Sequence, residues 1–507
     1  MKKLAEKLVT ENYKQGVITT YMIDLFCGAG GVTLGVSESK TNVKVIACIN
    51  HDEKAILSHL KNHPNCLHYI EDIRTIDLSP LTELVQWLRI LDPTCKIAVW
   101  ASLECTNFSK AKCGPKDADS RSLADDMFRY MEAFNPDFFW VENVEEFKDW
   151  GPLDKNNNPD KSKLGQFYRQ WVKELGDKHF QPHFYEDVLI ASNYGARTIR
   201  KRLFLQFAKD ARHIGVPVQT HSKDGSIGEH WLPVKDVLNL ENHGKSIFTR
   251  KKLLVWKTHR RIFKGLVKYG HEQGTHYGYK YYGQLGFQDI NDPCCTLTTK
   301  DRLYLMNIKP VAIKMDYGTS DARSINMPAQ TLTTSPKGDV IFTKSISFVH
   351  NPQYGGSNRS IEAPACTIIA RQDKAPLGLT SALSHELKCT LQKFDNPEGR
   401  PHIEFDGTNV IYNIFGTDDE WLIQIKEYMY KNQILDIKVR PLEIPEMLQI
   451  QGFPKDYTLY GTQEDQKKFI GNSVEKFVGI ALIRSIDKAI QNPSTPYITH
   501  SQLEIFN

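Results

Sequence analysis

The segment WASLECTNFSKAKCGPK, residues 100–116, places a cysteine between a glutamate and a threonine, directly after an apolar run. Cys105 could be an apolar filler, a metal ligand or a nucleophile. A free thiol titrates near about 8.5, and the lysines that follow favour the nucleophilic thiolate, whereas Glu104 opposes it. By composition alone, an inert and partly buried cysteine is the favoured interpretation.

Three more ionisable side chains come from two later apolar segments. Glu142 stands near the end of the run PDFFWVEN. Because a buried charged carboxyl is costly, we expect its pKa to rise and the group to carry a proton. Arg200 and Arg202 lie two residues apart at the start of another strand, so both should face one side. A thiol, a protonated acid and two guanidinium groups together favour Cys105 as a nucleophile.

A glycine turn supplies a candidate ligand-binding loop. DLFCGAGG, residues 24–31, follows an apolar strand and opens a helix. Gly28, Gly30 and Gly31 let the backbone approach a ligand that a Cβ would block. The spacing matches neither the triphosphate-binding nor the dinucleotide-binding glycine motif, which disfavours those ligands. A turn that serves only packing remains the alternative.

Polar acceptors follow the next two strands. Asn50 and Asp52 come after the second strand and Asp72 after the third. At the carboxyl edge of an open parallel sheet, such acceptors suit ribose hydroxyls and an adenine amino group. Capping of a helix start explains Asp52 easily and Asp72 less well.

Size and composition limit the class of protein. A chain of 507 residues should form two or more domains. No apolar run is long enough to span a membrane, and the first residues lack the apolar core of a signal peptide, so we expect a cytoplasmic protein. The ten cysteines form no CxxC pair and their spacing to histidines fits no zinc pattern. We therefore expect reduced thiols and no metal.

The first 210 or so residues alternate strand and helix patterns, which predicts a parallel α/β sheet with helices on both faces. We expect strands at 21–26, 42–50, 96–101 and 136–143, and helices at 52–63 and 122–134. From about 213 the chain is richer in Gly, Pro, Thr and Asn, which predicts a mostly β or irregular region. The expected domains are 1–212, 213–436, and 437–507 returning to the first.

Two further patterns lie in the later part of the chain. A weak repeat begins at Pro293, Pro328 and Pro364, each followed three residues later by threonine, and predicts Pro-led turns into short strands. The segment 471–490 predicts one amphipathic helix with Gly–Asn–Ser at its start.

A basic segment runs from Arg250 to Lys268 without an acidic residue. Apolar residues recur in it at roughly helical spacing. A solvated helix face is one interpretation. A helix that faces phosphates is favoured, because nothing acidic nearby offsets its charge.

Taken in order, these motifs resemble those of the cytosine-C5 DNA methyltransferases across nearly the whole chain. DLFCGAGG is similar to the family's first motif for S-adenosyl-L-methionine (AdoMet), and DI at 72–73 to its third. ECTNFS is similar to the nucleophile loop, ENV at 142–144 to the catalytic glutamate motif, and RKR at 200–202 to the Gln-x-Arg-x-Arg motif. RPLEIPEMLQIQGFP (440–454) and GNSVEKFVGIAL (471–482) look like the last two. The implied fold is a Rossmann-like AdoMet-dependent methyltransferase domain with a target-recognition domain.

The resemblance implies a mechanism. Cys105 attacks C6 of a cytosine flipped out of duplex DNA, and Glu142 donates to N3. Arg202 holds O2, and Arg200 supports the carboxylate. The implied AdoMet-binding residues are Asp24, Phe26, Gly28, Gly30, Asn50, His51, Asp52, Asp72, Ile73, Asn472, Ser473 and Val474. Among them, Phe26 should stack near the adenine, Asn50 or Asp52 should meet the ribose, and Asp72 the adenine amine.

Residues that contact DNA are expected in three places. The loop after the nucleophile, the basic segment and the threonines of the repeat would supply Ser109, Lys110, Lys112, Arg121, Lys257, Arg260, Arg261, Thr296, Thr331 and Thr367. The implied setting is a monomer that acts in DNA methylation or restriction–modification, in the cytoplasm of a bacterial or phage-infected cell.

Four positions depart from the family pattern. Glu104 replaces the usual proline and Thr106 the usual glutamine, while Asn50 replaces the ribose acid and Thr198 the first residue of Gln-x-Arg-x-Arg. These departures bear on the rate and on the choice between unmodified and modified cytosine. Two rivals remain: an RNA cytosine-C5 methyltransferase, and a sequence-specific DNA-binding regulator with a weakened site.

Overall fold

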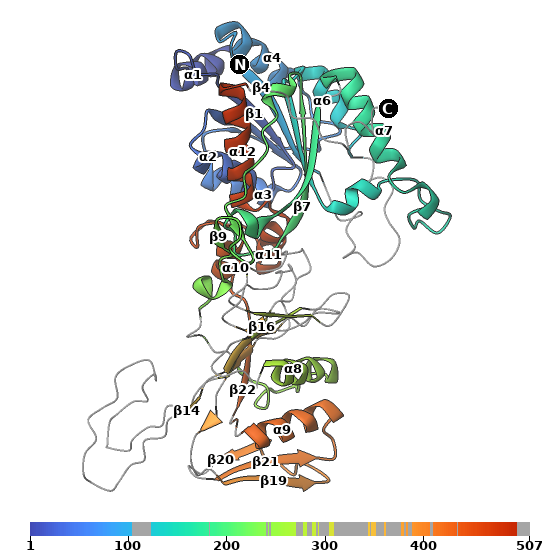
Figure 1. The fold of residues 1–507 in the computed structure, drawn as a ribbon, viewed down its shortest axis with the longest axis vertical. Coiled ribbons are helices and arrows are strands. Elements are labelled where there is room, and N and C mark those ends of the chain that lie inside the picture. Colours follow the sequence, from blue (N-terminus) through green and yellow to red (C-terminus); the bar gives the residue numbers. More distant parts are fainter. Residues whose placement is uncertain are drawn as a thin grey trace, which may run out of the picture. The chain divides into compact units, whose positions relative to one another are not determined.

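In the computed structural model, the chain forms two compact units (Figure 1). The first takes described residues of Met1–Ala196, Arg200–His230 and Gln451–Asn507, and the second those of Arg197–Ile199 and Trp231–Ile450. The structure describes residues 1–103, 123–181, 183–239, 242, 245–269, 277–280, 286–289, 293, 304–308, 343–344, 346–350, 359–360, 377–379, 382–383, 388–405, 409–432, 434 and 436–493.

A seven-stranded sheet forms the centre of the first unit, in the order β3-β2-β1-β4-β5-β7-β6. Its strands are β1 Thr20–Leu25, β2 Val43–Asn50, β3 Leu67–Ile70, β4 Lys96–Ser102, β5 Phe138–Asn143, β6 Phe184–Ile190 and β7 Lys201–Ala208. The first five in the order are parallel, as predicted. The antiparallel pairing of β7 with β5 and β6 was not predicted. It follows from the short connection between β6 and β7, which leaves no room for a crossover helix.

Helices cover both faces of this sheet, which confirms the predicted α/β architecture. One apolar cluster joins the sheet to α1, α4, α6 and α7, and another joins the opposite face to α2 and α12. Successive residues of β1 divide between them: Tyr21 and Ile23 pack in the first cluster and Met22 in the second. The helices are α1 Lys2–Asn12, α2 Gly31–Ser39, α3 Glu53–Asn62, α4 Ser79–Leu91, α6 Met127–Phe134, α7 Gln166–Leu175, α11 Gln463–Asn472 and α12 Lys476–Gln491.

Short elements connect these helices and strands. They are η1 Glu145–Asp149, η2 Lys161–Lys163, η3 Gly176–Phe180, η4 Ala191–Tyr194, η5 Ala211–His213 and the strand pair β8 His221–Ser222 and β9 Glu229–His230. Helix α6 begins at Met127, five residues after the predicted start, and residues 123–126 form a turn. Of the helices in the described part of the chain, none is long and apolar enough to cross a bilayer.

The predicted single helix at 471–490 is wrong. Asn472 ends α11, and α12 begins only at Lys476. Between them, Ser473 and Glu475 have extended backbone, and the Glu475 side chain accepts a hydrogen bond from Val478 N at 3.0 Å. The Glu475 side chain is therefore the N-cap of α12, and the Gly–Asn–Ser sequence ends the preceding helix.

The second unit contains mostly strands, as predicted. Its largest sheet has the order β10-β22-β13-β15-β11-β12, with β16 beside β15 and β17 beside β22. The strands are β10 Lys245–Ser246, β11 Tyr277–Lys280, β12 Gly286–Asp289, β13 Tyr304–Ile308, β14 Thr343–Lys344, β15 Ile346–His350, β16 Arg359–Ser360, β17 Leu377–Leu379, β18 Ala382–Leu383, β19 Lys388–Phe394, β20 Ile403–Phe405, β21 Asn409–Phe415 and β22 Ile437–Pro441.

Three α-helices and η6 Val234–Val237 complete the described part of this unit: α8 Trp256–Tyr269, α9 Glu420–Asn432 and α10 Ile444–Ile450. The basic segment is helical from Trp256 onward, and its residues 251–255 precede the helix. Helices α8 and α9 pack together, and α9 contacts β19 and β21. Pro293 is buried, and the other residues of the Pro-led repeats lie outside the described residues.

Candidate active site

Glu142 lies near the end of β5, buried between two arginines of one neighbouring segment. Its Oε1 is 3.1 Å from Arg202 Nε and 4.0 Å from Arg200 Nη2. Strand β7 runs antiparallel to β5, which brings the start of β7 to the end of β5. The prediction that both arginines face one side is confirmed, because both guanidinium groups approach the same carboxyl.

Burial raises the pKa of Glu142, and Arg202 and Arg200 offset only part of that rise. The direction predicted from the apolar sequence before Glu142 is thus confirmed, although the sequence did not supply the distances to the arginines. Arg200 is itself buried, and its Nη1 donates to the Gly471 carbonyl at 3.0 Å. The end of α11 is therefore joined to the charged cluster.

Strand β4 leads toward the predicted nucleophile. Its last residue, Ser102, is the register partner of Glu142 in the parallel pair β4–β5. Leu103, one residue further, is buried. Cys105 and the loop residues predicted to contact DNA lie outside the described residues: Ser109, Lys110, Lys112 and Arg121.

The glycine turn after β1 contains three residues in the left-handed region of backbone conformation. Phe26, Gly28 and Gly30 all have positive φ, of 57°, 53° and 103°. Among the described residues, a Cβ at Gly28 would have only the Phe26 carbonyl within 4 Å, so none of them crowds this side of the turn. A Cβ at Gly30 would lie 2.7 Å from Tyr457 Oη, and that hydroxyl donates to the Ala29 carbonyl at 2.6 Å. Tyr457 thus supports the turn from behind.

Asp24, at the end of β1, is fully buried and accepts from Thr33 Oγ1 at 3.2 Å. Burial raises the pKa of Asp24 to about 8, and the Thr33 hydrogen bond opposes this rise. Asp24 Oδ1 has no hydrogen-bond partner among the described residues. The carboxyl lies beneath the glycine turn rather than in solvent.

The acceptors after β2 and β3 have partners within the protein. Asn50 Oδ1 accepts from Asp52 N at 2.9 Å. Asp52 caps α3 through the amides of Lys54 and Ala55, and it pairs with Lys468 Nζ at 3.0 Å. The capping alternative therefore describes the position of Asp52. His51, between them, is exposed.

Asp72 forms a close pair with Arg74, at 2.6 Å between Oδ2 and Nη2. Hydrogen bonds from Arg74 lower the pKa of Asp72 to about 2. Ile73 is buried, and its carbonyl accepts from Arg129 Nη1 and Tyr130 Oη, both at 2.7 Å. Arg129 and Tyr130 hold this turn in place, and no local sequence signal predicted them.

The residues between α11 and α12 lie against the glycine turn. A Cβ at Gly31 would lie 2.0 Å from Ser473 Oγ and 2.6 Å from the Val474 carbonyl. Val474 is buried and Asn472 is exposed. Two segments more than 400 residues apart in sequence thus meet because residue 31 has no side chain.

In the second unit, α8 carries the described part of the predicted basic surface. Lys257 is exposed, with its Nζ 5.6 Å from the centre of the Trp256 ring. Arg260 lies over Trp421 at 5.5 Å, which ties it to α9. Arg261 belongs to α8, but its side chain lies outside the described part, as do Thr296, Thr331 and Thr367.

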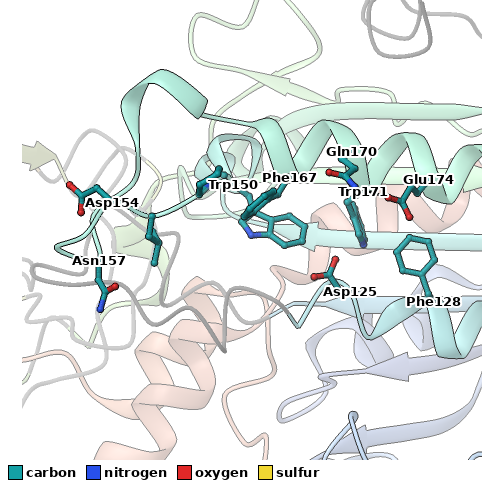
Figure 2. A pocket seen from close by; sticks show the side chains of 12 residues that line it. Asp125, Phe128, Trp150, Asp154, Asn157, Phe167, Gln170, Trp171 and Glu174 are labelled. Carbon is teal, nitrogen blue, oxygen red and sulfur yellow. Dashed lines mark hydrogen bonds between the residues drawn. The ribbon is translucent and has the colours of Figure 1, made fainter.

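A cavity of about 550 Å³ lies in the first unit, between the segment after β5 and helix α7 (Figure 2). Its lining combines Trp150, Trp171 and Phe167 with the carboxylates of Asp125 and Asp154. Of the predicted site residues that the structure describes, none lines it. It is therefore a feature separate from the Glu142 cluster.

The sequence matches the model of one protein family over more than half of its length. The family model for C-5 cytosine-specific DNA methylases matches residues 20–312 and 392–492, which is more than half of the chain. This match includes Glu142, both arginines and the glycine turn. It also includes the segment between α11 and α12.

Individual relatives are more distant. The chain is 28% identical over 217 residues to the type II methyltransferase M.SacI of Streptomyces achromogenes, covering 40% of this chain and 51% of that protein. It is 27% identical over 201 residues to M.AgeI of Thalassovita gelatinovora, covering 39% and 42%. The chain thus spans about half the length of the curated relatives it matches.

A solved structure described as a putative DNA modification methyltransferase encoded within an E. coli prophage is 15% identical. It covers 92% of this chain and 98% of its own, with a TM-score of 0.39.

Proposed function

Because this chain belongs to the C-5 cytosine-specific DNA methylase family, we propose that it methylates C5 of a cytosine flipped out of a specific duplex DNA sequence. The observation that carries the proposal is the buried Glu142 beside Arg200 and Arg202, with the end of β4 as its strand neighbour. Cys105 follows the end of β4 by three residues in sequence. The chain can therefore bring a thiol and a protonated acid to the ring of the same cytosine.

The protein's own groups would share the chemistry. The Cys105 thiolate attacks C6 of the cytosine, and this addition makes C5 nucleophilic. Glu142, whose pKa is raised by burial, donates a proton or hydrogen bond to N3 as charge develops on the ring. Arg202 holds O2, and Arg200 keeps the carboxyl in place. Once C5 has taken up the methyl group, transfer of the C5 proton to a base and expulsion of the Cys105 thiolate complete the cycle.

AdoMet would supply the methyl group, and the residues around the glycine turn fit such a ligand. In the described part of the chain no side chain crowds Gly28, whereas Tyr457 and Ser473 support the turn at Gly30 and Gly31. Phe26 would meet the adenine, while Asn50 and Asp72 offer acceptors at successive strand ends. Asn472 to Val474 would border the methionine part.

We further propose that the second unit reads the DNA, with α8 facing phosphates. The exposed Lys257 and the absence of acidic residues in the basic segment support this role. We also propose domain boundaries near residues 212 and 436. The protein would act as a monomer in restriction–modification.

The test is transfer of labelled methyl groups from AdoMet to duplex DNA and to tRNA, with Cys105→Ser as the inactive control. We expect labelling of duplex DNA alone, and bisulfite sequencing then gives the methylated site. Preferred labelling of tRNA would favour the RNA rival. Duplex DNA with 5-fluorocytosine should trap a covalent adduct, whereas binding without any adduct would favour the DNA-binding regulator.

A further inference from the structure

The cavity of about 550 Å³ in the first unit has no role in the proposed methyl transfer. Its volume lies within the roughly 300–1,000 Å³ typical of small-molecule sites. Its lining comes from the turn before α6, from the segment after η1 and from α7. Aromatic rings and carboxylates supply much of this lining, and none of its described residues is a lysine or an arginine. The lining therefore favours a cationic ligand.

Aromatic rings form a fixed wall of the cavity. Trp150 and Trp171 are both buried, with ring centres 6.5 Å apart, and Phe167 lies edge-on to Trp150 at 5.9 Å. Trp171 Nε1 donates to the Ala124 carbonyl at 2.8 Å, which joins α7 to the turn that carries Asp125. Because these rings are held in place, a ligand can bind without ordering them. The faces of such rings attract cations.

Two carboxylates of the lining have no cationic partner among the described residues. The Asp125 side chain forms no hydrogen bond or ion pair with any of them. Partial burial raises the pKa of Asp125, and the charges of Asp126 and Glu174 raise it further. Asp154 Oδ1 accepts from two amides of its own loop, at 2.8 and 2.9 Å, and neither donor carries a charge. A bound cation would offset both carboxylate charges.

Lys178 shows that this kind of lining can hold an ammonium group. Its Nζ pairs with Glu174 Oε2 at 3.0 Å and lies 5.0 Å from the centre of the Phe128 ring. Glu174 and Phe128 both line the cavity. Asp125 and Asp154 also accompany aromatic rings in the lining, but no ammonium group of the described residues pairs with them. An external ammonium group can therefore bind there as Lys178 does at the other carboxylate.

The two carboxylates without a cationic partner stand at separate places along the cavity. In Figure 2, the rings of Trp150 and Phe167 lie between Asp154 and Asp125. Methylene chains pack on apolar surface while their ammonium heads meet polar groups. Charges separated by apolar rings therefore fit ammonium groups that are joined by methylenes, and the arrangement favours an elongated cation.

A compact metal ion fits this lining less well, because it needs several oxygen ligands that converge on one point. In the described part of the chain, two groups of three side chains have ligand atoms within 4.8 Å of one another and can hold a metal ion. They are Cys27–Cys48–His59 and His59–Cys66–His68. Neither group lines the cavity, and no carboxylate of the cavity belongs to one.

We propose that this cavity binds a linear aliphatic polyamine. Its ammonium groups would meet Asp125 and Asp154, and its methylenes would pack on Trp150 and Phe167. A basic peptide carries similar ammonium groups, but a cavity of this volume suits a whole small molecule. The proposal is independent of the proposed methyl transfer.

The test uses the full-length protein without DNA, because polyamines also bind phosphates. Spermidine is titrated into the protein at fixed ionic strength and followed by calorimetry, with Mg²⁺ and tetralysine as competitors. Asp125→Asn and Asp154→Asn remove a charge but keep an acceptor oxygen, so the Asp154 loop retains its hydrogen bonds. Phe167→Leu removes a ring that is 38% exposed. Asp177→Asn, at an exposed position outside the lining, is the matched control.

We expect the parent and Asp177→Asn to bind one spermidine with equal affinity. Each of the three cavity variants should bind it at least about threefold more weakly, because each loses one charge or ring contact. The double variant Asp125→Asn/Asp154→Asn should lose about tenfold.

Three results would overturn the proposal. The first is a parent that shows no saturable binding, and the second is a double variant with the affinity of the parent. The third is displacement of spermidine by an equal concentration of a competitor. Displacement by Mg²⁺ would indicate a site for compact cations, and displacement by tetralysine would indicate a site for a basic peptide.

Discussion

The first and second units each bury a glutamate beside arginine, but the two pairs differ in how completely they are satisfied. In the second unit, Glu446 forms a two-point contact with Arg440, at 2.7 and 2.8 Å. It also accepts from the amides of Glu443 and Asn239, at 2.6 and 2.7 Å. Arg440 in turn donates to the carbonyls of Asn242 and Asn239. Both carboxylate oxygens of Glu446 and all three guanidinium nitrogens of Arg440 therefore have hydrogen-bond partners within the protein.

In the first unit, Glu142 has a contact at 3.1 Å and a more distant one at 4.0 Å. Its Oε1 receives no well-aligned hydrogen bond from the described residues. A buried acceptor left in this state costs free energy, which most proteins avoid. A fully satisfied pair holds the fold together, whereas an under-satisfied carboxyl keeps capacity for a ligand. That difference separates a structural pair from a catalytic candidate better than burial does.

Replacement of Glu142 should give the largest effect on activity. Glu142→Gln removes the proton donor for N3, so methyl transfer should fall about 10²- to 10⁴-fold. The raised pKa means that the fold disfavours the charged carboxyl, so a neutral amide should cost less than about 1 kcal/mol of stability. Single-turnover transfer and urea denaturation measure the two. A large loss in the free energy of unfolding of Glu142→Gln would contradict this distinction, because Glu142 would then stabilise the fold as Glu446 does.

Replacement of Glu446 should affect stability instead. Glu446→Gln leaves the buried Arg440 with a neutral partner, and the free energy of unfolding should fall by about 3–5 kcal/mol. Urea denaturation measures the loss. Glu420→Gln, at an exposed position of the same unit, is the control and should stay within about 0.5 kcal/mol. Equal stability of the two variants would contradict a structural role for the Arg440–Glu446 pair.

Asp24 extends the comparison to pH, because it is also buried with an unsatisfied oxygen. Its pKa is about 8 in the folded protein, against about 4 when unfolded. Folding thus favours the protonated form, and this contribution is present at low pH and lost as pH rises toward 8. Between pH 5 and pH 8, the free energy of unfolding of Asp24→Asn should therefore fall less than that of the parent. Urea denaturation at several pH values measures the two slopes.

Asp72→Asn is the control for this experiment. The pKa of Asp72 is lowered to about 2, so its contribution is lost only as pH falls toward 2. Between pH 5 and pH 8 it should keep the parent's slope. An Asp24→Asn variant with that same slope would show that Asp24 is ionised throughout the range.

The sequence predicted what depends on local pattern, and it failed where distant segments meet. Apolar runs located β1, β2, β4 and β5, and the carboxyl near the end of β5 allowed the direction of the Glu142 pKa shift to be predicted. The antiparallel β7 was not predicted, since strand direction depends on connection length and packing. The helix at 471–490 failed because Glu475 caps α12 within a segment of unbroken helical periodicity.

The site shows the same division. Arg200 and Arg202 could be placed on one face from their spacing alone. The support that Tyr457 gives to the glycine turn could not be predicted, because the contact joins residues 428 apart. The groups Cys27–Cys48–His59 and His59–Cys66–His68 were missed for the same reason, because their residues have no characteristic spacing in sequence.

The smallest expected effect tests whether the second unit meets DNA at all. Lys257 is exposed on α8, where a phosphate contact would release about one counterion, so Lys257→Ala should reduce the salt slope of duplex binding by about 0.9. Binding measured at several salt concentrations gives this slope. Lys173→Ala, at an exposed position of α7 in the first unit, should leave it unchanged. If Lys257→Ala has the same salt slope as the parent, Lys257 does not contact a phosphate. The exposed charge of α8 would then be a solvated face, and recognition of DNA would depend on other parts of the chain.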